Sequence, residues 1–65
     1  MTPTKIVLER TATHLQLRVF IPEAARGSTV IESTPVGTGK SLPNLRRQAV
    51  RYAIRFAIPF VDLTA

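Results

Sequence analysis

The sequence has no cysteine and no tryptophan, and its only histidine is His14. Without cysteine there is no disulfide framework and no thiolate chemistry, and one imidazole does not build a His/Cys metal site. We therefore expect neither a metal nor another cofactor. Long hydrophobic runs are also missing: the most apolar stretch, 49–63, is interrupted by two arginines, a proline and an aspartate, and is too short for a membrane span of roughly 20 residues. We expect no membrane span, no secretion signal and a cytoplasmic location.

The chain is short and basic. Its 65 residues include nine Lys+Arg and four Asp+Glu, for a net charge of +5, and 45% of the residues are hydrophobic. This composition forms a single small domain, 1–65, that buries about 60% of its unfolded surface. Such a domain is marginally stable, so a partner or a second copy of the chain would help it.

The first half of the chain predicts three strands. Residues 5–10 are rich in β-branched side chains, 14–21 alternate apolar and polar residues, and 28–33 alternate more weakly. The connection 11–13 has no Gly or Asn, so its hairpin is predicted from the flanking patterns and not from turn chemistry. Three consecutive strands indicate an antiparallel meander.

The second half predicts one helix over 42–58. Ser41 is a suitable N-cap, Pro43 fits the first helical turn, and Pro59 ends the helix. Apolar residues occupy more than half of its circumference. One face of a sheet would cover only part of this apolar surface. The expected fold class is α+β: a three-stranded antiparallel meander followed by a C-terminal helix packed on the sheet, in the order β-β-β-α.

Three arginines lie four residues apart on this helix: Arg47, Arg51 and Arg55. No acidic residue occurs between Ser33 and Val61, so local helix pairs cannot neutralise them. The row indicates a polyanion or an acidic partner surface; the alternative is a solvated helix face that keeps the protein soluble. Predicted nucleic-acid contacts are Arg18, Lys40, Arg46, Arg47, Arg51 and Arg55.

The segment 33–41 ends in Gly-Lys-Ser before the helix, as a phosphate-binding loop does. Thr34 stands where that motif needs glycine, and the chain is too short for the rest of an NTPase, so nucleotide hydrolysis is rejected. A weaker interpretation has Gly37, Gly39 and the helix N-terminus near Ser41 holding a backbone phosphate. The alternative is an ordinary loop before a helix.

His14 shares a strand face with Gln16 and Arg18. A neutral imidazole beside an arginine is suited to act as general base on a ribose 2′-hydroxyl, with the arginine stabilising the charge that develops on phosphorus. The alternative is a surface histidine. The sequence leaves open whether the chain is an enzyme; if it is, the reaction is that of a metal-independent ribonuclease with His14 as the catalytic residue.

Two segments resemble the HicA-type mRNA interferase toxins. Residues 7–18, VLERTATHLQLR, resemble the strand, turn with its histidine and second strand of that family. Residues 35–42, PVGTGKSL, followed by Leu45 and Arg46, resemble its Pro-Val-x-x-Gly-Lys-x-Leu segment and the start of its last helix. The resemblance implies a toxin of a toxin–antitoxin pair whose fold is a reduced relative of double-stranded-RNA-binding domains. It further implies that His14 is the catalytic residue and that Lys40 and the helix arginines contact RNA.

Two functions of different classes follow. The first is a small nucleic-acid-binding domain, with RNA favoured over DNA, that reads shape and phosphate. A single-stranded ligand is less favoured, because the strands offer only Phe20 as a stacking ring. The second is a phage- or plasmid-type interaction protein or inhibitor that docks its helix and tail on a partner or forms a homodimer. The docking residues would be Phe56, Ile58, Phe60, Val61 and Leu63.

Overall fold

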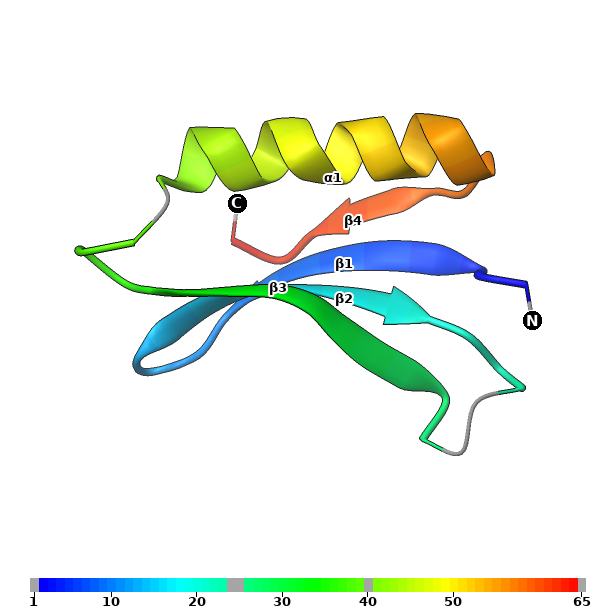
Figure 1. The fold of residues 1–65 in the computed structure, drawn as a ribbon, viewed down its shortest axis with the longest axis horizontal. Helices are drawn as coiled ribbons and strands as arrows, with labels where there is room; N and C mark the ends of the chain where they lie inside the picture. The colour runs from blue at the N-terminus through cyan, green and yellow to red at the C-terminus, as the bar shows by residue number, and fades with distance from the viewer. Residues whose placement is uncertain (1, 24–25, 40, 65) are drawn as a thin grey trace.

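The computed structural model describes residues 2–23, 26–39 and 41–64. These residues form one mixed sheet with a helix on one of its faces (Figure 1). The elements in chain order are β1 (Lys5–Arg10), β2 (His14–Phe20), β3 (Ser28–Pro35), α1 (Leu42–Phe56) and β4 (Phe60–Asp62). The predicted α+β class and the β-β-β-α order of the first four elements are confirmed.

The described sheet has four strands, so the prediction of three was wrong. Its order is β3-β2-β1-β4, with β1–β2 and β2–β3 antiparallel as expected and β4 parallel to β1. β4 is only three residues long and follows a proline, which left no alternation to read. It changes the role of the predicted docking tail: Ile58 and Phe60 pack against the core, while Phe56, Val61 and Leu63 are exposed.

The β1–β2 hairpin closes through a threonine side chain. The hydroxyl of Thr11 accepts hydrogen bonds from the backbone N–H of His14 at 3.0 Å and of Thr13 at 3.4 Å. The backbone N–H of Thr11 donates to the carbonyl of His14 at 2.8 Å. A hydroxyl that satisfies backbone donors in this way replaces the Gly or Asn that tight hairpins use.

Helix α1 begins where predicted and ends two residues early. Ser41 has extended backbone but makes no side-chain cap, and Pro43 lies in the first turn. At the other end Ala57 adopts a left-handed conformation, with φ 53°; its N–H donates to Ile54, and the N–H of Ile58 donates to Ala53 at 3.0 Å. These two bonds make a Schellman cap, which satisfies the last carbonyls before Pro59 and ends the helix.

The core lies between α1 and the first two strands. Alternate residues of β1 and β2 face the helix, and Leu45 and Ala49 face them from α1. The buried cluster consists of Ile6, Leu8, Leu15, Leu17, Val19, Leu45 and Ala49. Removing a side chain such as Leu17, which is fully buried, would cost about 2–5 kcal/mol.

Helix α1 does not cover the whole sheet. It packs over β1, β4 and β2, and no Cα atom of α1 lies within 8 Å of one in β3. β3 also carries a bulge, because Glu32 pairs with Leu17 and Val30 with Arg18, which leaves Ile31 without a partner in the register. Bulges increase strand twist, and the first residues of β3 curve away from the helix (Figure 1). The helix side of the first half of β3 is therefore open, whereas Thr34 near its end is buried.

Candidate nucleic-acid interface

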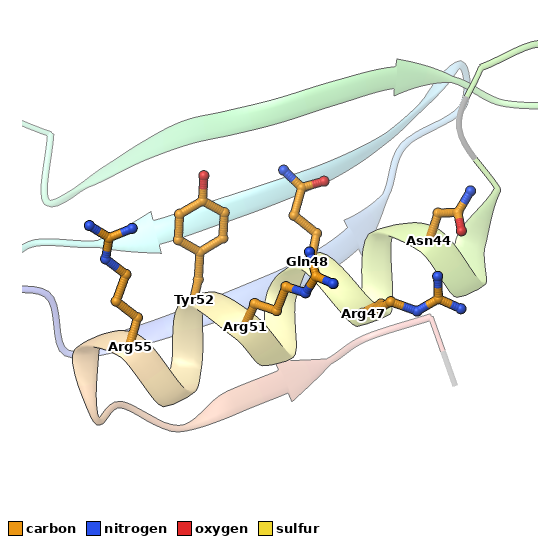
Figure 2. Close-up of a pocket in the computed structure, with 6 residues that line it drawn as sticks. All are labelled: Asn44, Arg47, Gln48, Arg51, Tyr52 and Arg55. Carbon is orange, nitrogen blue, oxygen red and sulfur yellow. The ribbon is translucent and has the colours of Figure 1, made fainter.

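Arg47, Arg51 and Arg55, called here the arginine row, lie on the exposed surface of α1. Successive members are about 6 Å apart along the helix axis, from a rise of about 1.5 Å per residue. Asn44, Gln48 and Tyr52 lie beside them, and the six residues line an open hollow of about 560 Å³ (Figure 2). Within the described ranges none of the three arginines has an ion-pair partner. The row is thus a set of uncompensated guanidinium groups around one depression.

Gln48 and Tyr52 extend from α1 toward β3 and form one wall of the hollow (Figure 2). The amide of Gln48 donates to Glu32 of β3 at 3.5 Å. This contact bridges the helix to β3 across the part of the sheet that α1 leaves open. It also places the carboxylate of Glu32 at the end of the Gln48 side chain, which lines the hollow.

Arg46 differs from its chain neighbour Arg47. Its Nε donates to Asp62 of β4 at 2.7 Å and its Nη2 donates to Thr64 at 3.1 Å. Hydrogen bonds from the hydroxyl and backbone N–H of Thr64, and the guanidinium of Arg46, hold the pKa of Asp62 below its ordinary value against the opposing effect of burial. Arg46 was predicted to contact nucleic acid, and the structure places its guanidinium in the seam between α1 and β4.

His14, Gln16 and Arg18 share the open face of the sheet, as predicted, while the residues between them are buried against α1. Arg18 donates to Glu9 at 3.0 Å and to Ser28 at 3.1 Å. His14 Nδ1 lies 2.8 Å from the hydroxyl of Thr13. His14 and Arg18 share the face opposite α1, but they are four strand residues, or about 13 Å, apart, and they do not join the arginine row.

The glycine loop before α1 is folded on itself. The N–H of Gly39 donates to the carbonyl of Pro35 at 3.0 Å, and Gly37 has φ 87°, which favours glycine. Gly39 lies so close to Thr34 and Pro35 that a side chain there would overlap them. The N–H of Gly39, which was predicted to hold a phosphate, is therefore already hydrogen-bonded within the loop. Lys40, also predicted to contact the ligand, lies outside the described residues.

An apolar groove adjoins the hollow, and sequence reasoning missed it. It has a volume of about 300 Å³ and lies between the second half of α1 and the paired end of β2 and beginning of β3. Its walls include Tyr52 and Phe56 from the helix, Val19 from β2 and Ile31 from β3. The two rings are parallel, with an interplanar angle of 4° and centroids 6.2 Å apart. Phe56 was predicted as a docking residue, but a groove between the helix and the sheet was not predicted.

Among the described residues, no group of three or more His, Cys, Asp or Glu side chains is arranged to hold a metal ion. In the same ranges, no helix is long and apolar enough to cross a membrane. Comparison with known proteins finds no matching family model, no similar curated protein and no similar solved structure. The functional assignment thus depends on the geometry and charge of the surface.

Proposed function

We propose that this chain is a nucleic-acid-binding domain, with RNA favoured over DNA, and that the arginine row on α1 is its contact surface. The observation that carries the proposal is the absence of any described ion-pair partner for three aligned, exposed guanidinium groups around one hollow. Like charges at this spacing repel each other in the free protein. A polyanion removes that repulsion when it binds.

Nucleic-acid phosphates suit the row in charge and in hydrogen bonding. The planar guanidinium offers paired donors that match two phosphate oxygens. Its spacing of about 6 Å along the helix is comparable to that of successive phosphates along a strand. Because the arginines are already exposed, binding has a small desolvation cost. Because binding releases counterions from the nucleic acid, the affinity depends strongly on salt.

The resemblance to HicA-type toxins extends the proposal to cytoplasmic mRNA cleavage with His14 as general base. His14 lies on the sheet face opposite α1, so an RNA on the arginine row would have to pass around the domain to reach it. We therefore expect binding and cleavage to separate. His14→Ala should leave the affinity unchanged and, if the chain cleaves RNA through this imidazole, abolish cleavage.

A matched pair of charge reversals tests the row. Arg51 is in the row, whereas Arg26 lies in the β2–β3 connection; both are exposed, and either change to Glu lowers the net charge of +5 by two. We expect Arg51→Glu to weaken binding of a fluorescent RNA or DNA about tenfold or more and to reduce the salt slope by about 0.7–0.9. Arg26→Glu should have a much smaller effect. Fluorescence anisotropy at about 50 and about 200 mM salt measures both quantities.

Equal losses in Arg51→Glu and Arg26→Glu would show that net charge, and not the row, attracts the ligand. No binding of RNA or DNA at about 50 mM salt would overturn the proposed function. Circular dichroism of each variant separates lost binding from lost folding.

Self-association or docking on a protein is the second candidate, favoured by the other flank of α1. Val50 and Ile54 continue the helical line of Arg46, which contacts β4, and Ile54 is 76% exposed. Leu63, just beyond β4, is 63% exposed. Exposed apolar side chains of this kind are typical of interfaces. Sedimentation of the wild type and of Ile54→Lys tests for a homodimer: a wild-type monomer at high concentration would contradict it.

A further inference from the structure

We propose that the nucleic acid bound here is single-stranded, with its phosphates on the arginine row and at least one base in the apolar groove against Tyr52. This inference rests on the proposed function and adds the substrate class to it. It also reverses the preference for a duplex drawn from the sequence, in which only the strands were searched for stacking rings.

The groove is a product of the fold. The bulge at Ile31 turns the first half of β3 away from α1, and the helix covers only β1, β4 and β2. Phe56 is consequently 45% exposed and Ile31 37% exposed, although both line a concave surface. Filling an apolar depression that is open to water with a flat apolar group lowers the free energy of the system.

Tyr52 connects this groove to the arginines. It is the one described residue that lines both the polar hollow and the apolar groove. Arg51 and Arg55 flank it in the sequence, one position before it and three after it, and both line the hollow (Figure 2). Cationic groups and an apolar, aromatic-lined depression therefore meet along a single helix edge.

A single strand has the chemistry that this edge can bind. Its phosphates lie on one side of the sugar chain and its unpaired bases on the other, so both contact types form together. A duplex presents the same phosphates but keeps its base faces stacked inside, which leaves the groove empty. The combination of a charged row with an adjacent stacking ring therefore selects for unpaired nucleotides.

Charge complementarity also distinguishes this occupant from a second copy of the chain. A copy docked in the groove would bring its own basic surface toward Arg51 and Arg55, and like charges across an interface are unfavourable. An anionic strand has the opposite effect. The two remaining occupants, a copy and an acidic peptide, are outcomes of the test below.

Intrinsic fluorescence tests the proposal at one residue, because Tyr52 is the only tyrosine and the chain has no tryptophan. The protein is titrated with unlabelled single-stranded RNA, single-stranded DNA and the corresponding duplexes, while anisotropy of labelled copies reports binding. N-acetyltyrosinamide in parallel samples corrects for light absorbed by the nucleic acid. We expect strong quenching by single strands, from stacking on the phenol ring, and little by duplexes at equal saturation.

Aromatic variants on the two faces of the molecule give the matched control. Tyr52→Ala should weaken single-strand binding about 5- to 150-fold, the range of one base–aromatic stack, and leave duplex binding nearly unchanged. Tyr52→Phe retains a stacking ring and should bind almost as the wild type does. Phe20→Ala removes a ring that stacks under Lys5 on the open sheet face and should have little effect.

The outcomes separate this inference from the proposed function. Equal affinity for single strands and duplexes, or unchanged Tyr52 emission at saturation with single strands, overturns this inference while the proposed function stands, provided that Arg51→Glu still loses binding. No binding of any nucleic acid overturns both. Concentration-dependent quenching by the protein alone, or quenching by an acidic peptide and not by single strands, assigns the groove to a second copy or to a peptide. If Tyr52→Ala unfolds, the quenching of wild-type Tyr52 emission still decides.

Discussion

The two flanks of α1 meet the sheet in different ways. On the β4 flank, Arg46 reaches Asp62 and Thr64, and the strand runs close beside the helix. On the β3 flank the strand diverges, and Gln48 makes one long contact with Glu32. The first flank is closed by a charge pair, and the second holds an open hollow and an apolar groove.

Arg46 and Arg47 show what this difference teaches. They are adjacent in the chain and identical in chemistry, but their positions differ by about 100° around the helix. Arg46 therefore reaches the carboxylate of Asp62, whereas Arg47 is exposed. Burial and pairing, and not residue type, therefore decide which arginine stabilises the fold and which is available to a ligand.

Among substitutions that test the two flanks, Gly39→Ala has the largest expected effect on stability, because it disturbs the connection between β3 and α1. A Cβ there would overlap the hydroxyl of Thr34, which is 5% exposed, and lie 3.0 Å from Cδ of Pro35. Because Thr34 is buried, we expect a loss of about 1–3 kcal/mol. Urea denaturation measures it. Gly37→Ala is less crowded but strained by its positive φ, so a greater loss there would contradict the steric explanation.

An intermediate effect separates Arg46 from Arg47. Arg46→Ala should destabilise the domain by about 1 kcal/mol, since it leaves Asp62 without a charged partner, which corresponds to a fall in Tm of roughly 4–8 °C. Arg47→Ala should change stability by less than about 0.5 kcal/mol and weaken nucleic-acid binding. Thermal melts and anisotropy titrations on the same samples provide both readouts. If both variants shift Tm equally, the two flanks do not differ as described.

The smallest effect is a pH dependence confined to the β4 flank. Asp62 has a lowered pKa in the folded state because Thr64 and Arg46 favour its charged form. Its contribution to stability is thus complete above the unfolded pKa of about 3.9 and is lost as the pH falls through the lower folded value. Denaturation at about pH 7 and about pH 3 should show a larger acid loss for the wild type than for Asp62→Asn. Equal acid losses would contradict the assignment.

Elements with a long local pattern were predictable. The alternation over 14–21 predicted β2 and the face of His14, and Pro43 and Pro59 placed α1 to within two residues at its C-terminal end. The arginine row followed directly from helical spacing. These features depend on neighbours in the chain, which is why one sequence sufficed for them.

Features that depend on distant residues were not predictable. The bond between Arg46 and Asp62 spans 16 positions, and β4 is too short to show a period. The groove depends on a bulge in β3 and on where the helix crosses the sheet, neither of which has a local signal. The sequence showed the charges of the candidate site but not the hollow beside them.

The parallel pairing of β4 with β1 has a consequence for folding. β1 is synthesised before the other strands and the helix, yet Ile6 pairs with Phe60 and Leu8 with Asp62. One edge of β1 thus stays unpaired on a nascent chain until residue 62 has left the ribosome. Pairing of β1 with β4 closes a loop of roughly fifty residues, which makes this step slow. The antiparallel strands and the helix can form earlier. The last, three-residue strand then determines when the longer edge of β1 is covered, after which the edges of the sheet are β3 and the short β4.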